Sequence, residues 1–142
     1  MQKTDEEITQ LIRRKGLRCT KTKLRVITVL SESSRPQTIK QIADSAVCSH
    51  LVSIYRSIDT LLKADIIKVV SDSKGKPRYE LSDVLNPHHH HIFCTSCSKV
   101  ETIDDHAIEE SIKDIATKAG YSLQGHQLEL SGLCGLCARD KL

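Results

Sequence analysis

The sequence is poor in aromatic residues, which form 3% of its 142 residues and include no tryptophan. Its three tyrosines and one phenylalanine are scattered singly, which excludes the stacked aromatic platforms that many binders of single-stranded nucleic acid use. The hydrophobic core must therefore be aliphatic. Hydrophobic residues at 39% and charged residues at 27% are ordinary for a folded chain of one domain or two small ones.

The sequence also lacks long apolar segments. No apolar run approaches the roughly 18 residues that a membrane-spanning helix needs. The first residues, Met1–Glu7, are too charged for a secretory signal, so we expect a cytoplasmic protein that has no membrane partner. Cysteines stay reduced in that compartment, where closely spaced pairs of them indicate metal ligands before disulfides.

The charge is divided unequally along the chain, although its net value is only +3. Residues 1–82 carry 16 Lys and Arg against 9 Asp and Glu, a net +7, whereas residues 83–142 carry 5 against 9, a net −4. Six of the seven histidines and four of the six cysteines lie in the acidic part. This division predicts a DNA-binding domain over residues 1–82, a hinge over 83–87 and a metal-binding domain over 88–142.

The basic part has the element order of a winged helix-turn-helix. Helical periodicity predicts four helices, the second capped by Thr20, the third beginning near Thr38 and the fourth capped by Ser49. Two strands follow, residues 66–70 and 78–81, joined by a Gly-containing hairpin. An apolar stripe on the fourth helix is expected to face the core; it consists of Leu51, Ile54, Tyr55, Ile58, Leu61 and Leu62.

In such a domain the fourth helix enters the major groove of double-stranded DNA. Its other face presents small polar side chains around one arginine, namely Ser53, Arg56, Ser57 and Thr60. The residues predicted to contact DNA are Arg18, Ser53, Arg56, Lys74 and Lys76. The alternative is a small helical domain whose Lys and Arg are merely solvated. For Tyr55, core packing and groove contact both stay open.

Two Cys-x-x-Cys pairs are the strongest pattern in the acidic part. Each pair places two thiolates on one tight turn, and two such turns complete the tetrahedral shell of a structural zinc ion. The alternative, a redox-active dithiol, is disfavoured because two matched pairs occur: Cys94 with Cys97, and Cys134 with Cys137. Between the pairs we expect a strand over residues 121–130, preceded by a helix capped by Asp104 or Asp105, with Ile108, Ile112, Ile115 and Ala119 inward.

Four consecutive histidines, His88–His91, precede the first cysteine pair. Side chains alternate along a strand, so the four divide into two pairs on opposite faces, which can support two metal sites. His126 on the later strand and Glu109 on the helix are candidate partners, and a solvated loop is the alternative. Cys19 and Cys48 stand apart and are expected to be small buried hydrophobic residues, although Cys48 is a conceivable soft ligand.

These motifs resemble the ferric uptake regulator (Fur) family over nearly the whole chain. The resemblance rests on the run of residues 88–100, on Glu109, His126 and the second cysteine pair, and on residues 16–20 and 53–56 of the basic part. It implies an α+β fold, in which an N-terminal winged helix precedes a C-terminal α/β dimerisation domain, and a homodimeric, metal-dependent transcriptional repressor rather than an enzyme. By position, it implies a structural zinc at Cys94, Cys97, Cys134 and Cys137, a regulatory metal at Glu80, His89 and His91, an additional metal at His88, His90, Glu109 and His126, and DNA contacts by Tyr55 and Arg56.

Three departures from the family pattern bear on the regulatory metal. Pro36 stands where many members have a histidine, Thr102 where many iron and peroxide sensors have a carboxylate, and His90 where iron sensors often have aspartate. By strand alternation, the neighbouring Glu101 points to the other face.

Nitrogen-rich shells that are poor in oxygen favour Zn²⁺ over Fe²⁺ or Mn²⁺. We therefore expect a zinc-responsive repressor that binds a pseudo-palindromic operator as a homodimer. The alternatives are an iron- or peroxide-responsive regulator of the same family, a zinc-dependent hydrolase and a zinc-knuckle adaptor protein. The hydrolase is disfavoured because the sequence has no His-Glu-x-x-His motif.

Overall fold

The computed structural model describes residues 4–47 and 50–140, and its mixture of helices and strands confirms the predicted α+β class. The chain divides into two compact units, Met1–Pro87 and His88–Leu142. In the ranges that the structure describes, no helix has the length and apolar character needed to cross a bilayer.

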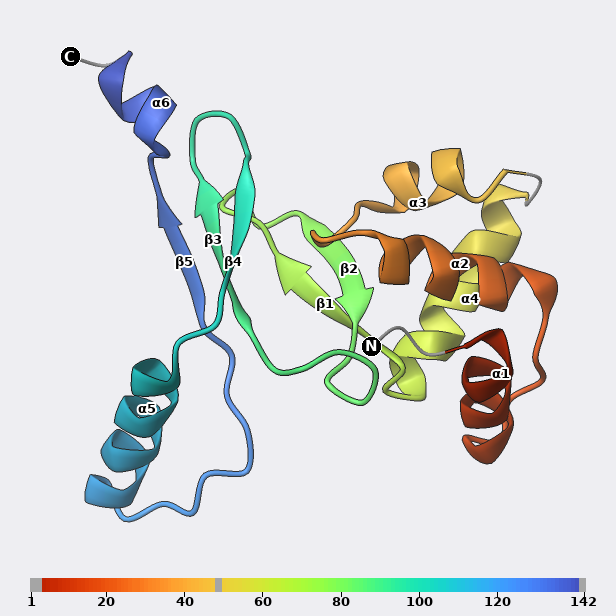
Figure 1. The fold of residues 1–142 in the computed structure, drawn as a ribbon, viewed down its shortest axis with the longest axis horizontal. Helices are drawn as coiled ribbons and strands as arrows, with labels where there is room; N and C mark the ends of the chain where they lie inside the picture. Colours follow the sequence, from red (N-terminus) through yellow and green to blue (C-terminus); the bar gives the residue numbers. More distant parts are fainter. Residues whose placement is uncertain (1–3, 48–49, 141–142) are drawn as a thin grey trace. The chain divides into compact units, whose positions relative to one another are not determined.

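The first unit contains helices α1 (Asp5–Arg14), α2 (Lys21–Glu32), α3 (Ile39–Ser45) and α4 (Leu51–Lys63), followed by the antiparallel hairpin of β1 (Ile67–Ser71) and β2 (Pro77–Leu81) (Figure 1). Thr20 caps α2 as predicted, and Thr38, near which the third helix was predicted to begin, caps α3. Each hydroxyl accepts a hydrogen bond from a backbone N–H of the first turn, which would otherwise lack a partner. The cap predicted at Ser49 lies outside the described residues, and α4 follows His50.

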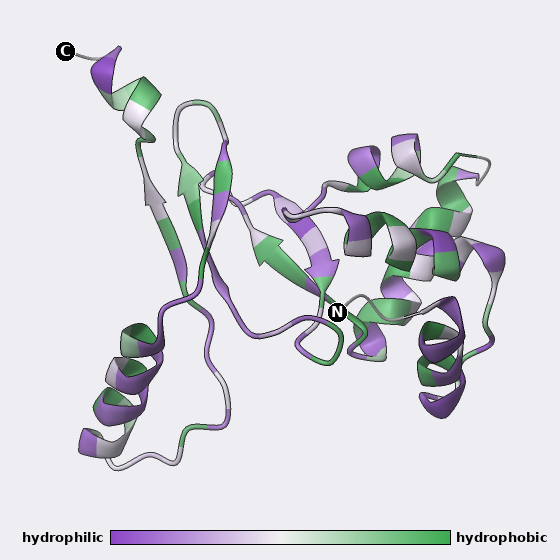
Figure 2. Cartoon of the chain, in the orientation of Figure 1, coloured by the Kyte–Doolittle hydropathy of each residue, from purple (hydrophilic) through white to green (hydrophobic). Residues whose placement is uncertain are grey.

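Aliphatic side chains from all four helices and the hairpin form the core of this unit. Figure 2 shows hydrophobic residues, in green, on the helices and the hairpin. Ile54, Ile58 and Leu61 of α4 are buried as predicted. The prediction is wrong for Leu51, which is 52% exposed, and Tyr55, for which core packing was one of two alternatives, is 50% exposed. Tyr55 follows Ile54 by one residue, a turn of about 100° around the helix axis, which carries its ring away from the core.

Asp72 organises the turn of the hairpin. One carboxylate oxygen accepts hydrogen bonds of 2.9 Å from the backbone N–H groups of Lys74 and Lys76, and the other lies 3.4 Å from the Arg78 guanidinium. Burial alone would raise the pKa of Asp72, but the hydrogen bonds from Lys76, Lys74 and Arg78 lower it below the ordinary value. Gly75 has a φ of 72°, a left-handed conformation that glycine adopts without strain. The turn leaves the Lys74 and Lys76 side chains exposed.

The second unit is built on a three-stranded sheet. Its elements are β3 (His90–Cys94), β4 (Val100–Ile103), α5 (His106–Lys118), β5 (Glu129–Gly132) and α6 (Gly135–Arg139). The strand order is β4-β3-β5, with β3 antiparallel to β4 and parallel to β5. The helix α5 lies in the connection from β4 to β5, which makes the parallel pairing of β3 and β5 possible.

The structure changes what was predicted for the helices and the last strand of this unit. Asp105, one of the two predicted caps, does cap α5. The predicted inward face of α5 is wrong, because no residue of α5 is buried and Ile115 is 66% exposed. Periodicity shows which face of a helix is apolar, not whether another element covers it. The strand predicted over residues 121–130 is confined to Glu129–Gly132, because β3 offers β5 partners only from His91 to Cys94. The short helix α6 was not predicted.

Candidate metal centres and DNA-binding face

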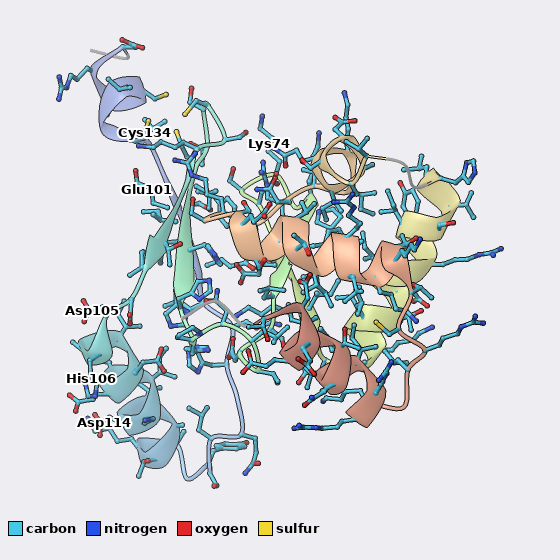
Figure 3. All side chains as sticks on the ribbon, turned by 45° about the vertical axis from the view of Figure 1, so that its right-hand side comes forward. Lys74, Glu101, Asp105, His106, Asp114 and Cys134 are labelled. Carbon is cyan, nitrogen blue, oxygen red and sulfur yellow. The ribbon has the colours of Figure 1, made fainter. Side chains whose placement is uncertain are left out.

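The parallel pairing of β3 and β5 brings the two cysteine pairs together. Cys94 ends β3 opposite Gly132, and the next backbone N–H, of Thr95, donates a 2.8 Å hydrogen bond to the Gly132 carbonyl. Cys97 lies on the turn that follows β3, and the second pair lies on α6 and its N-cap. Residues that are almost 40 positions apart in sequence thus meet at one end of the sheet. Figure 3 shows Cys134 at this end.

The four cysteines fit a tetrahedral zinc ion. Their sulfur atoms lie within 4.8 Å of one another, and the sulfurs of Cys97 and Cys134 are 3.8 Å apart. A Zn–S distance of about 2.3 Å places the sulfurs of a regular tetrahedron about 3.8 Å apart. The pKa of Cys94 is lowered to about 6, mainly because the backbone N–H of Cys134 donates a hydrogen bond of 3.4 Å to its sulfur. Lowering the pKa favours the thiolate, the form that binds metals.

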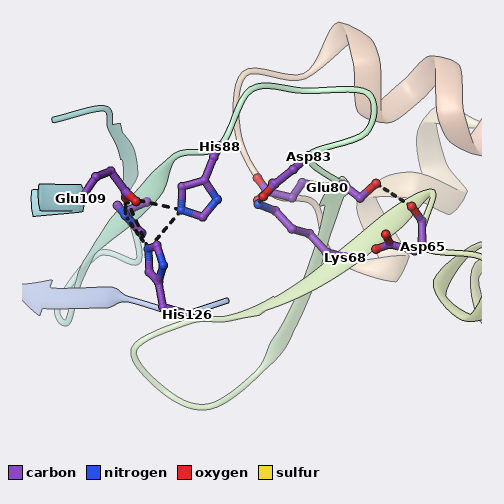
Figure 4. Close-up of polar contacts among 9 residues, drawn as sticks. Asp65, Lys68, Glu80, Asp83, His88, Glu109 and His126 are labelled. Atoms are coloured by element: carbon purple, nitrogen blue, oxygen red, sulfur yellow. Dashed lines mark hydrogen bonds and ion pairs between the residues drawn. The ribbon is translucent and has the colours of Figure 1, made fainter. Parts of the chain in front are cut away.

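A second cluster lies at the other end of the β3–β5 pairing. The pairing begins with His91 and Glu129, and His88 and His126 lie in the segments that precede these two residues. The Nε2 atoms of His88 and His126 are 3.1 Å apart, and His126 Nε2 is 3.4 Å from that of His90. The cluster is completed from α5 by Glu109, whose Oε1 lies 2.6 Å from His90 Nε2. Figure 4 shows His88, Glu109 and His126 pointing toward one another.

Glu109 stands at the centre of this cluster, since its Oε1 is also 3.5 Å from His88 Nε2 and 3.3 Å from His126 Nε2. The hydrogen bond with His90, followed by the charges of His126 and His88, lowers the pKa of Glu109 despite some desolvation. Nitrogen and oxygen ligands about 2.0–2.1 Å from a zinc ion lie about 3.3–3.4 Å apart in a tetrahedron. The distances of 2.6–3.5 Å are centred near that value, so the three imidazoles and one carboxylate fit a divalent metal.

The other two histidines of the run lie together as well. The rings of His89 and His91 have centroids 4.8 Å apart, which agrees with the predicted alternation into two pairs. Thr102 is the β4 partner of His91, and Glu101 is the partner of Ile92, so Glu101 is on the opposite face from His91, as predicted. The third ligand predicted for this pair, Glu80, belongs to the first unit, and the site remains a prediction.

Neither Pro36 nor Cys19 contributes a metal ligand among the described residues. Pro36 is fully buried in the first unit and has no donor atom in its side chain. Cys19 was predicted to be buried but is only half-buried; it packs against the core, with its sulfur 3.9 Å from the Thr9 hydroxyl. Cys48 lies outside the described residues.

The side chains predicted to contact DNA are accessible on the first unit. Tyr55 and Arg56 are adjacent on α4 and both are exposed, and the wing turn presents Lys74, which Figure 3 labels. Their exposure favours groove contact for Tyr55 over core packing. The full set comprises exposed Arg18, Tyr55, Arg56, Lys74 and Lys76 and half-buried Ser53.

Sequence comparison places the chain among known regulators. A model of the ferric uptake regulator family matches residues 14–131. The ferric uptake regulation protein of Campylobacter jejuni is 29% identical over 143 residues, covering 96% of this chain and 89% of the relative. That of Campylobacter upsaliensis is 33% identical over 141 residues, covering 93% of this chain and 87% of the relative.

Structural comparison agrees with the sequence. The Helicobacter pylori ferric uptake regulator, described as having three functional metal binding sites, matches with a TM-score of 0.81 and 27% identity. The match covers 96% of this chain and 95% of that one, and it confirms the architecture of a winged helix followed by a dimerisation domain. Proteins of this family regulate transcription and are not enzymes, so the hydrolase alternative is wrong. The chain belongs to the ferric uptake regulator family of metal-responsive, DNA-binding transcription regulators.

Proposed function

We propose that this regulator is a zinc-responsive repressor that acts in the cytoplasm as a homodimer on a pseudo-palindromic operator. The observation that carries the proposal is the nitrogen-rich donor set of the second unit. His89 and His91 lie together, and Thr102, the strand partner of His91, offers no carboxylate. The other three imidazoles converge on one carboxylate. Such a shell suits zinc better than the harder Fe²⁺ or Mn²⁺, which favour more oxygen ligands.

The four cysteines supply a separate, structural zinc site in this proposal. An all-thiolate shell leaves no open position for a substrate, as is usual for structural zinc. The bound ion would link the end of β3 to α6 and stabilise a unit whose described helices bury no residue. Its loss should therefore affect folding and dimerisation before it affects DNA recognition directly.

Glu80, His89 and His91 are proposed as the regulatory ligands. A metal held jointly by the winged-helix unit and the dimerisation unit would favour one orientation of the two DNA-binding units in the dimer. If that orientation matches the spacing of the operator half-sites, metal and DNA raise each other's affinity by the same factor. The charge and accessibility of Arg18, Ser53, Tyr55, Arg56, Lys74 and Lys76 support their role as DNA contacts.

The second candidate is an iron-responsive regulator, because the relatives reported above are named ferric uptake regulation proteins. The two candidates differ in which metal raises operator affinity. Titrations with Zn²⁺, Fe²⁺ and Mn²⁺ under anaerobic conditions, read by the affinity for one duplex, distinguish them. If Fe²⁺ raised operator affinity at a lower free concentration than Zn²⁺ did, the zinc proposal would be overturned and the family assignment would stand.

A double variant, His89→Ala with His91→Ala, tests the regulatory site. We expect it to keep its fold and its cysteine-bound zinc while operator affinity no longer changes with added metal. Circular dichroism and zinc analysis establish the first point, and fluorescence anisotropy with a labelled duplex measures the second. An unaltered metal response would exclude these ligands, and wholesale unfolding would make the site structural.

A further inference from the structure

A recess between α2 and α4 has a composition that the DNA contacts predicted from the sequence do not explain. Its walls come from the first turn of α2 and from residues of α4 spaced at i, i+3, i+4 and i+7, which share one helix face. The lining consists of Thr20, Thr22, Lys23, Ser53, Arg56, Ser57 and Thr60. It contains five hydroxyls and two cations, and neither a carboxylate nor an apolar side chain.

Two of its polar side chains, Lys23 and Ser57, are buried. Ser57 was predicted to lie on the exposed face of α4, yet it is only 6% exposed, and it lines the recess. Lys23 is 9% exposed, and its ammonium group donates one hydrogen bond, of 2.9 Å, to the Arg18 carbonyl. An ammonium group has three hydrogens to donate, so two remain for a ligand. Both side chains line the recess, so an acceptor bound there could take hydrogen bonds from them.

The remaining donors point to an anion. The recess includes the N-terminus of the 12-residue helix α2, where the helix dipole favours negative charge. Arg56 forms no ion pair with the described residues, and the nearest carboxylate on α4, Asp59, is bound to Lys63 at 2.8 Å. An ion with several acceptor oxygens satisfies hydroxyl, ammonium and guanidinium donors together, and phosphate is the common biological group of this kind.

We propose that this recess binds one backbone phosphate of the operator duplex, held by Lys23 and Ser57 and flanked by Arg56. The inference rests on the proposed DNA-binding function and deepens it by naming a contact. Half or more of protein–DNA hydrogen bonds go to the backbone, and these contacts set the register in which base-reading side chains meet the groove. A phosphate fixed between α2 and α4 would position the exposed Tyr55 on the same helix.

The test uses the full-length protein and a duplex that the protein itself selects from a randomised pool. Lys23→Gln should weaken duplex binding about tenfold or more and reduce the slope of log affinity against log salt by about 2 for a dimer, one phosphate per subunit. Ser57→Ala should weaken binding about fivefold with little change in the slope, because no charge is lost. Lys63→Gln, which removes a charge from the far end of α4, is the matched control and should leave both values near those of the wild type.

Methylphosphonate scanning locates the contact and guards against a loss of fold. Replacing one backbone phosphate at a time by a neutral group should weaken wild-type binding at one position per half-site, and Lys23→Gln should be insensitive at that position. Equal sensitivity of both proteins at every position would overturn the proposal. The proposal would also be overturned if the wild type bound inorganic phosphate saturably while Lys23→Gln bound the duplex as tightly as the wild type. That result would indicate a site for free phosphate. Failure to select any duplex would instead refute the proposed function.

Discussion

Replacing Glu109 by glutamine tests the cluster of His88, His90 and His126 with a minimal change of shape. The substitution keeps an oxygen near the three imidazoles and removes the charge that a divalent metal requires. Glu109 Oε1 lies 2.6–3.5 Å from all three Nε2 atoms, so one oxygen supplies a whole corner of the ligand tetrahedron. Four-ligand zinc sites have binding constants of roughly 10⁷ to 10¹², so an equal quarter of the binding free energy corresponds to roughly 60- to 1,000-fold in affinity. We expect zinc affinity at this site to fall by a factor in that range.

Competition with a chromophoric chelator, on protein whose cysteine site is already loaded, measures the effect. Glu110→Gln provides the matched control, since Glu110 is the next residue of α5 and carries the same charge. Its side chain is 71% exposed and lies 3.5 Å from His106, outside the cluster. We expect its zinc affinity to equal that of the wild type. Equal affinities of Glu109→Gln and Glu110→Gln would refute the assignment of this cluster as a metal site.

Three further predictions concern stability and metal retention. Asp72→Asn should lower the free energy of unfolding by about 1–2 kcal/mol at neutral pH, because charged hydrogen bonds are lost. Folding lowers the pKa of Asp72, so this contribution is full above the ordinary value of about 3.9 and disappears as pH falls through the folded pKa. In urea melts from pH 7 to pH 3, the free energies of unfolding of wild type and variant should therefore converge. Cys97→Ser should release the structural zinc to a chelator that leaves the wild type loaded, which elemental analysis measures, and retention would contradict a four-cysteine site. Leu61→Ala, at a fully buried position, should cost about 3 kcal/mol in thermal or urea unfolding, whereas a loss below about 1 kcal/mol would contradict its place in the core.

Local chemistry explains which parts of the fold could be predicted from the sequence. Thr20 and Thr38 act as caps because a hydroxyl at that position meets a backbone N–H of the first turn whatever surrounds the helix. The division of the histidine run into two pairs follows equally from strand alternation alone. A four-cysteine zinc site needs both cysteine pairs in one place, whatever the fold that carries them, so their convergence was also predictable.

Tertiary packing decides the parts that could not be predicted. Periodicity places Ser57 on the exposed face of α4, but the packing of α2 against α4 covers it. Its small size, which allows two helices to approach closely, was the one feature of the sequence that could have indicated burial. Tyr55 looks apolar and inward, yet its neighbours Ile54 and Ile58 occupy the core-facing side. The length of β5 depends on the pairing that β3 provides, which a single sequence does not contain.

The most direct test of the central claim is the affinity of the wild-type protein for its selected duplex with and without free zinc. The protein must retain its cysteine-bound metal in both conditions, as checked by elemental analysis. Coupling of metal to DNA binding of the usual size changes affinity about 5- to 150-fold. We predict an increase in that range when zinc is added. Identical affinities in the two conditions would contradict it.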